Sequence, residues 1–343
     1  MKRRRVRADT CLLNTSHPGA ETRKPLPGTF AHAMKLSPSP HAFTRLAHKL
    51  APGGTVLRTQ PLNGGSSARM DALEIMQANG TCLRVVVRRP GAAALTRNPQ
   101  TARNEYQLLV ALHTQGIAVP RPLLLDETGS CFPTPILALE YIEGAADFAP
   151  SHPIGTAHQL AAQLARIHQV NIAAPGIENL QQLPAVLSPP AATALEQVHI
   201  RAVIANAWPP PQSNAPTLLH GDYWPGNVLW RNEQLVTIID WEDAGLGEPL
   251  RDLAIARLDL LWIYGRTAME AFTSAYRVLQ PIHYLNLPVW DLFAALRLAR
   301  LVGTNLDGWA AFFPPLGRTD ITAQHIRAHY NWFVAQALRQ LNA

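Results

Sequence analysis

The sequence predicts an α+β protein with two lobes, a β-rich lobe over residues 40–144 and a mainly helical lobe over residues 145–343. Three short segments between residues 55 and 88 are rich in β-branched and apolar side chains and are separated by turn-forming residues, which is typical of an antiparallel meander. Beyond residue 144, apolar residues recur at the spacing of amphipathic helices. A chain of 343 residues is long enough for two domains with a large buried core.

The first 39 residues are expected to be a disordered basic tail. Residues 1–24 contain seven Lys or Arg against two acidic residues and therefore hold five of the six net positive charges of the chain. The segment is rich in Pro, Gly, Ser and Thr and has no sustained apolar period. It is either a tail or the product of an upstream start codon, with Met34 as the functional start. Because the rest of the chain is nearly neutral, the net charge does not indicate a nucleic-acid partner.

The composition also bears on membranes and on the cellular compartment. No apolar run reaches the roughly 18 residues that a membrane span needs, and the longest candidate, Leu253 to Tyr264, is interrupted by Arg257 and Asp259. The three cysteines are far apart and lack metal-ligand spacing, so they do not suggest a disulfide framework or a zinc site. We expect a soluble, cytoplasmic protein without a membrane partner, and its oligomeric state stays open.

The meander consists of expected strands at residues 55–60, 72–76 and 81–88. The connection between the first two strands contains Gly and Ser, whose backbone amides can approach a phosphate closely. The same composition suits any hairpin loop, so this feature alone does not choose between the two interpretations. The residues concerned are Gly64, Gly65, Ser66 and Ser67.

A helix is expected over residues 98–116, from an Asn-Pro start to a Gly stop. Glu105 lies on the same stripe of this helix as the apolar residues. A buried carboxylate needs a cationic partner, since it would otherwise cost several kcal/mol or take up a proton. The preceding strand ends in Arg88-Arg89, which could supply a structural salt bridge or an ion pair that orients a phosphate.

Residues 134–144 resemble a buried strand that ends in Gly, and helices follow it. A capping box from Thr156 to Gln159 is expected to start the first of these helices. Pro- and Ala-rich stretches at 181–193 and 208–216 indicate loops on either side of a short helix. Further helices are expected at about 266–279, 289–302 and 320–340.

The stretch "LLHGDYWPGNVLW" at residues 218–230 carries the densest set of chemically active side chains. "NVLW" and "VTIID" are expected to pair as a hairpin. A turn centred on Glu233-Gln234 would make Asn227 and Asp240 directly opposed neighbours, about 5 Å apart. Carboxylate and amide oxygens of this kind are suitable ligands for Mg²⁺.

Asp222 lies five residues before Asn227, in a loop that Pro225 and Gly226 curl back toward the same point. It could accept or orient the proton of an attacking hydroxyl. Any one of these residues alone would more often be a turn-forming or capping side chain, but three in register favour a site. A metallohydrolase is a third possibility, although His220 and Asp222 lack further His ligands at suitable spacing.

Several motifs together resemble the aminoglycoside phosphotransferase family, also called the phosphotransferase enzyme family, whose fold is similar to that of eukaryotic protein kinases. In that wider group the spacing D-x-x-x-x-N is a phosphoryl-transfer signature. The resemblance covers about residues 40–340 and implies a protein-kinase-like two-lobe fold. The motifs are, in chain order, the Gly/Ser loop at 63–67, the cationic strand end at 88–89, Glu105, the connector "LEYIEG", "HGDYWPGN", "DWE" and "GEPLRDLA".

The resemblance implies a role for each matching residue. Asp222 would position the acceptor hydroxyl and take its proton, and Asn227 and Asp240 would hold Mg²⁺ on the phosphates of ATP. His220 and Asp252 would brace the catalytic loop rather than touch the substrate.

The resemblance also implies a nucleotide site in the first lobe. Arg88, paired with Glu105, would orient the phosphates. The backbone around Glu140 to Ile142 would meet adenine. The loop from Gly64 to Ser67 would cover the phosphates.

Two departures from the wider kinase pattern matter. The last Lys of the chain is Lys49, before any expected strand, so an arginine must replace the usual phosphate-binding lysine. Arg88 is the first candidate and Arg89 the second, because adjacent strand residues face opposite ways. Trp241-Glu242 follows Asp240 where a protein kinase has Phe-Gly, which favours a small-molecule kinase.

The implied function is that of an ATP- and Mg²⁺-dependent phosphotransferase acting on a hydroxyl of an aminoglycoside, an amino alcohol or a sugar. The missing lysine motivates an alternative, a nucleotide-binding pseudokinase or binding module without turnover. The acceptor stays open, because the balance of charge beyond residue 144 is only weakly acidic. Tryptophans could line a cation–π site for an amine or belong to the core. They are Trp224, Trp241, Trp262 and Trp309.

Overall fold

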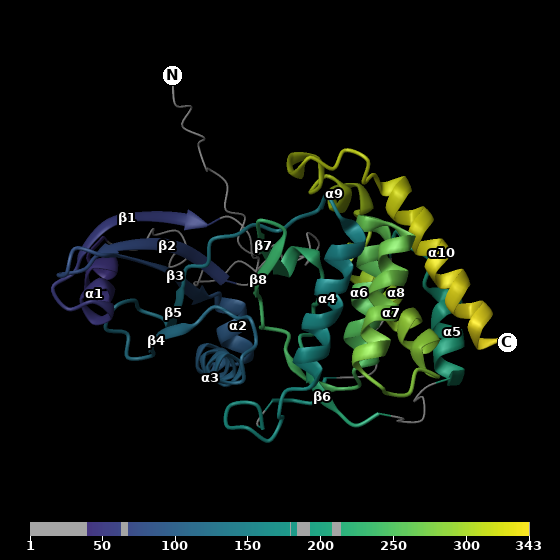
Figure 1. The fold of residues 1–343 in the computed structure, drawn as a ribbon, viewed down its shortest axis with the longest axis horizontal. Coiled ribbons are helices and arrows are strands. Elements are labelled where there is room, and N and C mark those ends of the chain that lie inside the picture. The colour runs from purple at the N-terminus through teal and green to yellow at the C-terminus, as the bar shows by residue number, and fades with distance from the viewer. Residues whose placement is uncertain (1–39, 63–67, 179, 184–192, 208–213, 343) are drawn as a thin grey trace, which may run out of the picture.

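The structure is a computed structural model that describes residues 40–62, 68–178, 180–183, 193–207 and 214–342. It has the predicted α+β class, with a five-stranded antiparallel sheet at one end of the molecule and a group of helices at the other (Figure 1). The arrangement agrees with the two-lobe α+β architecture expected from the sequence.

The sheet has the strand order β1-β2-β3-β5-β4, and every neighbouring pair is antiparallel. The three strands of the predicted meander are all present, each longer than expected, and the predicted strand at 134–144 is shorter. The fourth strand in chain order was not expected. The strands are β1 (Thr55–Leu62), β2 (Ala68–Met76), β3 (Cys82–Pro90), β4 (Pro122–Asp126) and β5 (Ile136–Glu140).

Helices cover both faces of the sheet. Helix α1 (Pro40–Leu50) was not predicted, and its Phe43 packs in the same core cluster as Val85 and Val87 of β3. Val86 instead belongs to the larger cluster that includes the buried residues of α3 (Thr101–Thr114). The alternation of side chains along β3 therefore separates the two faces.

The predicted helix at 98–116 begins three residues later than expected. Asn98 ends a short helix that the sequence did not reveal, α2 (Ala92–Arg97), and its Oδ1 accepts a hydrogen bond from the backbone N–H of Gln100 at 3.0 Å. The Asn-Pro pair therefore lies in a turn between two helices instead of starting α3 at Thr101.

The helical part is built around α6 (Leu250–Tyr264), whose residues are buried along almost the whole helix. This burial explains the apolar run at 253–264, which belongs to a core helix of the lobe. Among the residues that the structure describes, no helix is long and apolar enough to cross a membrane. The other helices are α4 (Pro153–His168), α5 (Val198–Ala207), α7 (Arg266–Leu279), α8 (Leu287–Val302), α9 (Leu306–Ala310) and α10 (Ala323–Leu341).

The predicted helices at 266–279, 289–302 and 320–340 correspond to α7, α8 and α10, and the predicted short helix corresponds to α5. The capping box was wrong, because α4 starts at Pro153 and Thr156 is buried inside its first turn. A proline at the first helical position starts the helix three residues earlier.

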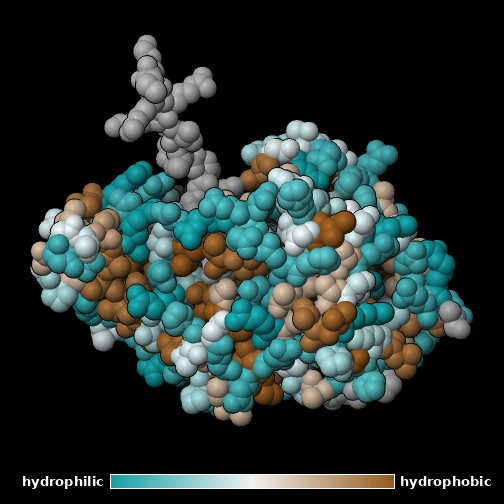
Figure 2. All heavy atoms as spheres, viewed as in Figure 1, coloured by the Kyte–Doolittle hydropathy of each residue, from teal (hydrophilic) through white to brown (hydrophobic). Residues whose placement is uncertain are grey.

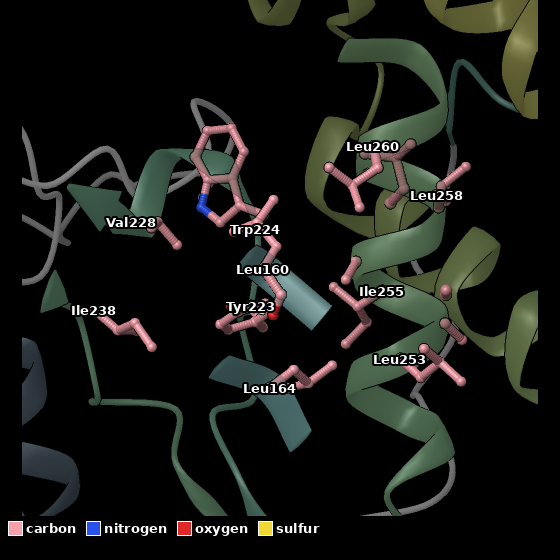
Figure 3. Packing of buried hydrophobic residues seen from close by; sticks show 14 of the residues in the cluster. Leu160, Leu164, Tyr223, Trp224, Val228, Ile238, Leu253, Ile255, Leu258 and Leu260 are labelled. Atoms are coloured by element: carbon pink, nitrogen blue, oxygen red, sulfur yellow. Dashed lines mark hydrogen bonds between the residues drawn. The ribbon is translucent and has the colours of Figure 1, made fainter. Parts of the chain in front are cut away.

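Helix α4 and the chain after residue 220 share one core. Figure 3 shows Tyr223 beside Leu160 and Leu164 of α4, and its hydroxyl donates to the backbone oxygen of Leu160 at 2.9 Å. Tyr223 and Trp224 are almost fully buried, so the segment that carries the polar motif is anchored by two large side chains. The face shown in Figure 2 is mostly hydrophilic, with hydrophobic residues in several groups over the sheet-bearing part, near the middle of the view and over the helical part.

Candidate active site

Two short strand pairs and one turn of 3₁₀ helix hold the loop that contains the polar motif. Strand β6 (Thr217–Leu219) pairs with β9 (Gly245–Gly247) before the loop, and β7 (Val228–Arg231) pairs with β8 (Gln234–Ile238) after it. A turn of 3₁₀ helix, Pro225–Asn227, lies between them. Both ends of the loop are therefore fixed by strand pairing within the helical part of the fold.

His220 and Asp252 hold this loop in place through hydrogen bonds. The Asp252 carboxylate accepts hydrogen bonds from the backbone N–H groups of His220 at 2.6 Å and Gly221 at 3.1 Å. The ring of His220 donates from Nε2 to the backbone oxygen of Ile239 at 3.0 Å, and its Nδ1 accepts from the backbone N–H of Asp222. Burial lowers the pKa of His220, which favours the neutral ring that these two contacts require.

Gly221 permits the turn before Asp222. Its φ is +82°, and a Cβ atom there would collide with the backbone oxygen of Asp243. We expect Gly221→Ala to lower the free energy of unfolding by about 3 kcal/mol or more, because it adds a backbone clash to an unfavourable φ. Gly265→Ala is the matched control, since Gly265 has a φ of +90° with nothing within 4 Å of the added atom. Urea unfolding of both variants checks this, and equal losses would show that the clash is relieved.

The carboxylate of Asp222 is held on both oxygens. Its Oδ1 accepts from Nη2 of Arg297 at 2.6 Å, and its Oδ2 accepts from Nδ2 of Asn227 at 3.0 Å. The same Asn227 nitrogen also donates to the backbone oxygen of Asp222 at 2.9 Å. Sequence reasoning missed Arg297. The sequence offered little signal, because Arg297 is one of three charged residues in the largely apolar helix α8 (Leu287–Val302), with Asp291 and Arg300.

The predicted register of Asn227 and Asp240 is wrong. The hairpin turns at Asn232-Glu233, both with positive φ, and the pairing places Asn227 opposite Ile239. Asp240 has a φ of +66°, which ends the alternation of strand β8 at this point. Left-handed backbone, and not direct cross-strand pairing, therefore sets the direction of the Asp240 side chain.

Asn227 and Asp240 nevertheless share a feature that a cation site requires. The Oδ1 atoms of both are buried and accept no hydrogen bond from any residue that the structure describes. Burial, the largest influence, and the neighbouring Glu242 carboxylate raise the pKa of Asp240 to about 8, against the opposing effect of Arg88. Two buried oxygen acceptors in need of positive charge fit a hard divalent cation.

This electrostatic strain leads to a prediction about stability without metal. Because the pKa of Asp240 is higher in the folded protein than in the unfolded chain, this residue lowers the free energy of unfolding as the pH rises from about 4 to about 8. We expect the free energy of unfolding of Asp240→Asn, minus that of the wild type, to be larger at about pH 9 than at about pH 6, with both proteins in EDTA. Thermal unfolding at both pH values measures the difference. The same difference at both values would contradict the raised pKa.

The buried Arg88 lies between three carboxylates. Its Nε donates to Glu105 at 2.9 Å, and its Nη2 donates to Glu242 at 2.8 Å and lies 3.8 Å from Oδ1 of Asp240. Arg89 faces the opposite side of the sheet and pairs with Asp71 instead. The structure therefore brings Arg88 and Glu105 together as the sequence suggested. Glu242, two residues after Asp240, was not assigned a role.

A pocket lies between the sheet and the hairpin β7–β8. It contains five of the predicted site residues at its wall, Arg88, Glu105, Glu140, Ile142 and Asp240. Apolar side chains from both parts of the fold form the rest. They are Met70, Val86, Leu109, Pro120, Leu139, Leu229, Ile239 and Trp241. The arrangement is an apolar slot with a charged end. The remaining predicted nucleotide residues, Gly64, Gly65, Ser66 and Ser67, lie outside the described residues.

Two other interpretations of the sequence lose support. Trp224, Trp262 and Trp309 are each about 1% exposed, so they belong to the core and do not form a cage for an amine. Within the part of the chain that the structure describes, no group of three or more His, Cys, Asp or Glu side chains is arranged to hold a metal ion. A zinc-hydrolase site is therefore not found there.

The fold and the pocket define a protein of the kinase-like class, and comparison with known proteins identifies its family. The profile of the phosphotransferase enzyme family matches residues 58–296. The chain belongs to this family.

Solved structures share the fold of this chain. A protein from Ralstonia eutropha JMP134 assigned as an aminoglycoside phosphotransferase superposes with a TM-score of 0.58 at 15% identity, covering 88% of this chain and 99% of that one. The amicoumacin kinase hAmiN, solved with AMP-PNP, Ca²⁺ and Ami, superposes with a TM-score of 0.54 at 16% identity, covering 85% and 92%. At this level of identity the likeness establishes the fold alone.

Curated relatives are distant and much longer. Acyl-CoA dehydrogenase family member 11 of Rattus norvegicus is 25% identical over 264 residues, which cover 64% of this chain and 32% of that protein. Acyl-CoA dehydrogenase family member 10 of Mus musculus is 27% identical over 248 residues, covering 66% and 22%. The chain thus spans about a third or less of the length of these relatives.

Proposed function

We propose that the protein is an ATP- and Mg²⁺-dependent phosphotransferase that moves the γ-phosphate to a hydroxyl of a small molecule of the aminoglycoside, amino alcohol or sugar type. The observation that carries this proposal is the position of Arg88, bound by Glu105 at the charged end of an apolar pocket that Asp240 also lines. A guanidinium held in this way can bind phosphate oxygens without first being ordered.

The pocket suggests how a nucleotide lies. The backbone around Glu140 to Ile142 would hydrogen-bond adenine, and apolar residues such as Val86 and Leu229 would enclose the base. This orientation directs the phosphates toward Arg88. The Gly64 to Ser67 loop would cover them from above.

Asn227 and Asp240 would hold Mg²⁺ through the buried oxygens that lack hydrogen-bond donors among the described residues. When bound, the ion would neutralise charge on the phosphates of ATP. It would also relieve the repulsion between Asp240 and Glu242.

Asp222 would act on the acceptor. The acceptor oxygen forms a bond to the γ-phosphorus, the bond from that phosphorus to the β–γ bridging oxygen breaks, and ADP leaves. The hydroxyl proton passes to the carboxylate of Asp222, which later releases it to water. Asn227 keeps this carboxylate oriented through its hydrogen bond to Oδ2.

The proposal includes the division of the chain. Residues 40–144 would form the nucleotide-binding lobe, residues 145–343 the catalytic and substrate lobe, and residues 1–39 a tail that takes no part in catalysis. A cytoplasmic location, close to the supply of ATP, suits this activity, which needs neither nucleic acid nor a membrane.

A nucleotide-binding protein without turnover is the second candidate. It is favoured by the contact of Arg88 with Glu242, because a phosphate must compete with that carboxylate for the guanidinium. Binding without transfer would follow if the competition kept the phosphates out of line.

The decisive experiment is a transfer screen by mass spectrometry. The protein is incubated with MgATP and a panel of amino alcohols, sugars and aminoglycosides, with Asp222→Asn as the inactive control. A mass gain of one phosphoryl group on one class of acceptor supports the proposal and names the substrate. MgATP binding without transfer to any acceptor or to water would favour the second candidate, and absence of binding would overturn both.

A further inference from the structure

Arg297 reaches the reacting carboxylate from a part of the chain that the known motifs do not include. It lies on α8, 75 residues after Asp222, and its Nη2 is 2.6 Å from Oδ1 of Asp222. Its side chain is 14% exposed. Because Asn227 holds the other oxygen, two separate elements together determine the plane of the Asp222 carboxylate.

Arg297 is surrounded by carboxylates that keep its guanidinium positively charged. Burial alone would lower the pKa of Arg297. The carboxylates of Asp222, Asp243 and Asp259 raise it by more, so its pKa is higher than usual and the guanidinium stays charged. Without this partner, the Asp222 carboxylate would keep the hydrogen bond from Asn227 on Oδ2 but would lose the contact that fixes Oδ1. The contact therefore fixes the direction of the Asp222 carboxylate.

A second buried pair on the same helix shows what a purely structural bridge looks like. Arg257 of α6 binds Asp291 of α8 through two hydrogen bonds of 3.0 Å, and its Nη1 donates to Thr273. Arg257 and Asp291 are not among the residues that line the pocket, and the side chain of Arg257 donates to Asp291 and Thr273. The pair of Arg257 and Asp291 joins α6 to α8, whereas the pair of Arg297 and Asp222 joins α8 to the carboxylate proposed to act in the reaction.

We propose that Arg297 is a positioning residue for phosphoryl transfer, which holds the carboxylate of Asp222 turned toward the acceptor hydroxyl. This inference rests on the proposed function. In a transition state with little bond formation, the carboxylate mainly orients the attacking oxygen, so loss of its orientation lowers the turnover rate rather than nucleotide affinity.

The test uses MgATP with water as the acceptor, together with the best acceptor of the transfer screen. Arg297→Met is expected to lower kcat by about 10- to 100-fold and to leave the Kd of MgATP within about twofold. Arg297→Lys should lie between, because a point charge restores attraction without the planar geometry. Millimolar guanidinium chloride should restore part of the activity of Arg297→Met, an effect that a structural role would not produce. Arg257→Met, the matched control, should lower Tm and keep kcat.

Each outcome decides the proposal. Wild-type kcat in Arg297→Met, or a loss of nucleotide affinity as large as the loss of kcat, would overturn it. If Arg297→Met does not fold, Arg297→Lys decides alone: reduced kcat at unchanged Kd supports the proposal, and wild-type kcat overturns it. Activity lost in Asp222→Asn but kept in Arg297→Met removes the role of Arg297 alone, whereas a wild-type protein without any transfer removes the proposed function as well.

Discussion

Asp222→Asn is expected to slow phosphoryl transfer by about two or more orders of magnitude while nucleotide affinity stays nearly unchanged. The amide has the size of the carboxylate and can still accept from Asn227, so the loop should keep its shape. It cannot take the proton of the acceptor, and it no longer balances the charge of Arg297. Single-turnover rates and MgATP titrations of the variant measure the two effects separately.

Asp240→Ala is the complementary control. It removes one of the two buried oxygens proposed for Mg²⁺, so nucleotide binding that depends on the metal should be lost. Asp222 and Asp240 thus have different expected roles, one in the transfer step and one in binding. Equal loss of nucleotide affinity in both variants would show that this division is wrong.

Breaking the pair of Arg88 and Glu105 is expected to have the second large effect. Arg88→Ala and Glu105→Ala should each lower phosphoryl transfer strongly, because Glu105 orients the cation that binds the phosphates. The two effects should not add, since either change leaves the second little to remove. A double-mutant cycle on the transfer rate should give a coupling of about 1–3 kcal/mol.

The structure supplies a control and a caution for this cycle. Arg89→Ala should leave transfer unchanged, because Arg89 pairs with Asp71 on the other face of the sheet. Arg88→Ala also leaves Glu105, Glu242 and Asp240 without their common cation, so its Tm must be measured alongside its rate. Arg88→Lys should keep partial activity. An unchanged transfer rate in Arg88→Ala together with a large loss of rate in Arg89→Ala would contradict the role proposed for Arg88 in binding the phosphates.

Much of the fold was predictable because its signals are local. Runs of β-branched residues separated by turn residues predict the meander strands, and apolar residues at helical spacing predict α7, α8 and α10. Helices α1, α2, α6 and α9 were not predicted. Helices α2 and α9 have only six and five residues. Helix α6 is buried on nearly all sides, so it lacks the polar face that produces a helical period.

The sequence by itself determined the family and the set of polar residues in the motif, because the spacing from Asp222 to Asn227 and on to Asp240 is a property of one continuous segment. The tertiary structure decided the rest. It placed Arg88, and not Arg89, beside Glu105, because α3 covers that face of β3. The left-handed backbone of Asp240 sets the direction of its side chain, which a register argument does not foresee. The tertiary structure also brought Glu242 and Arg297 to the site. Such contacts depend on the packing of elements far apart in the chain, where burial and charge pairing outweigh the local preferences that a sequence displays.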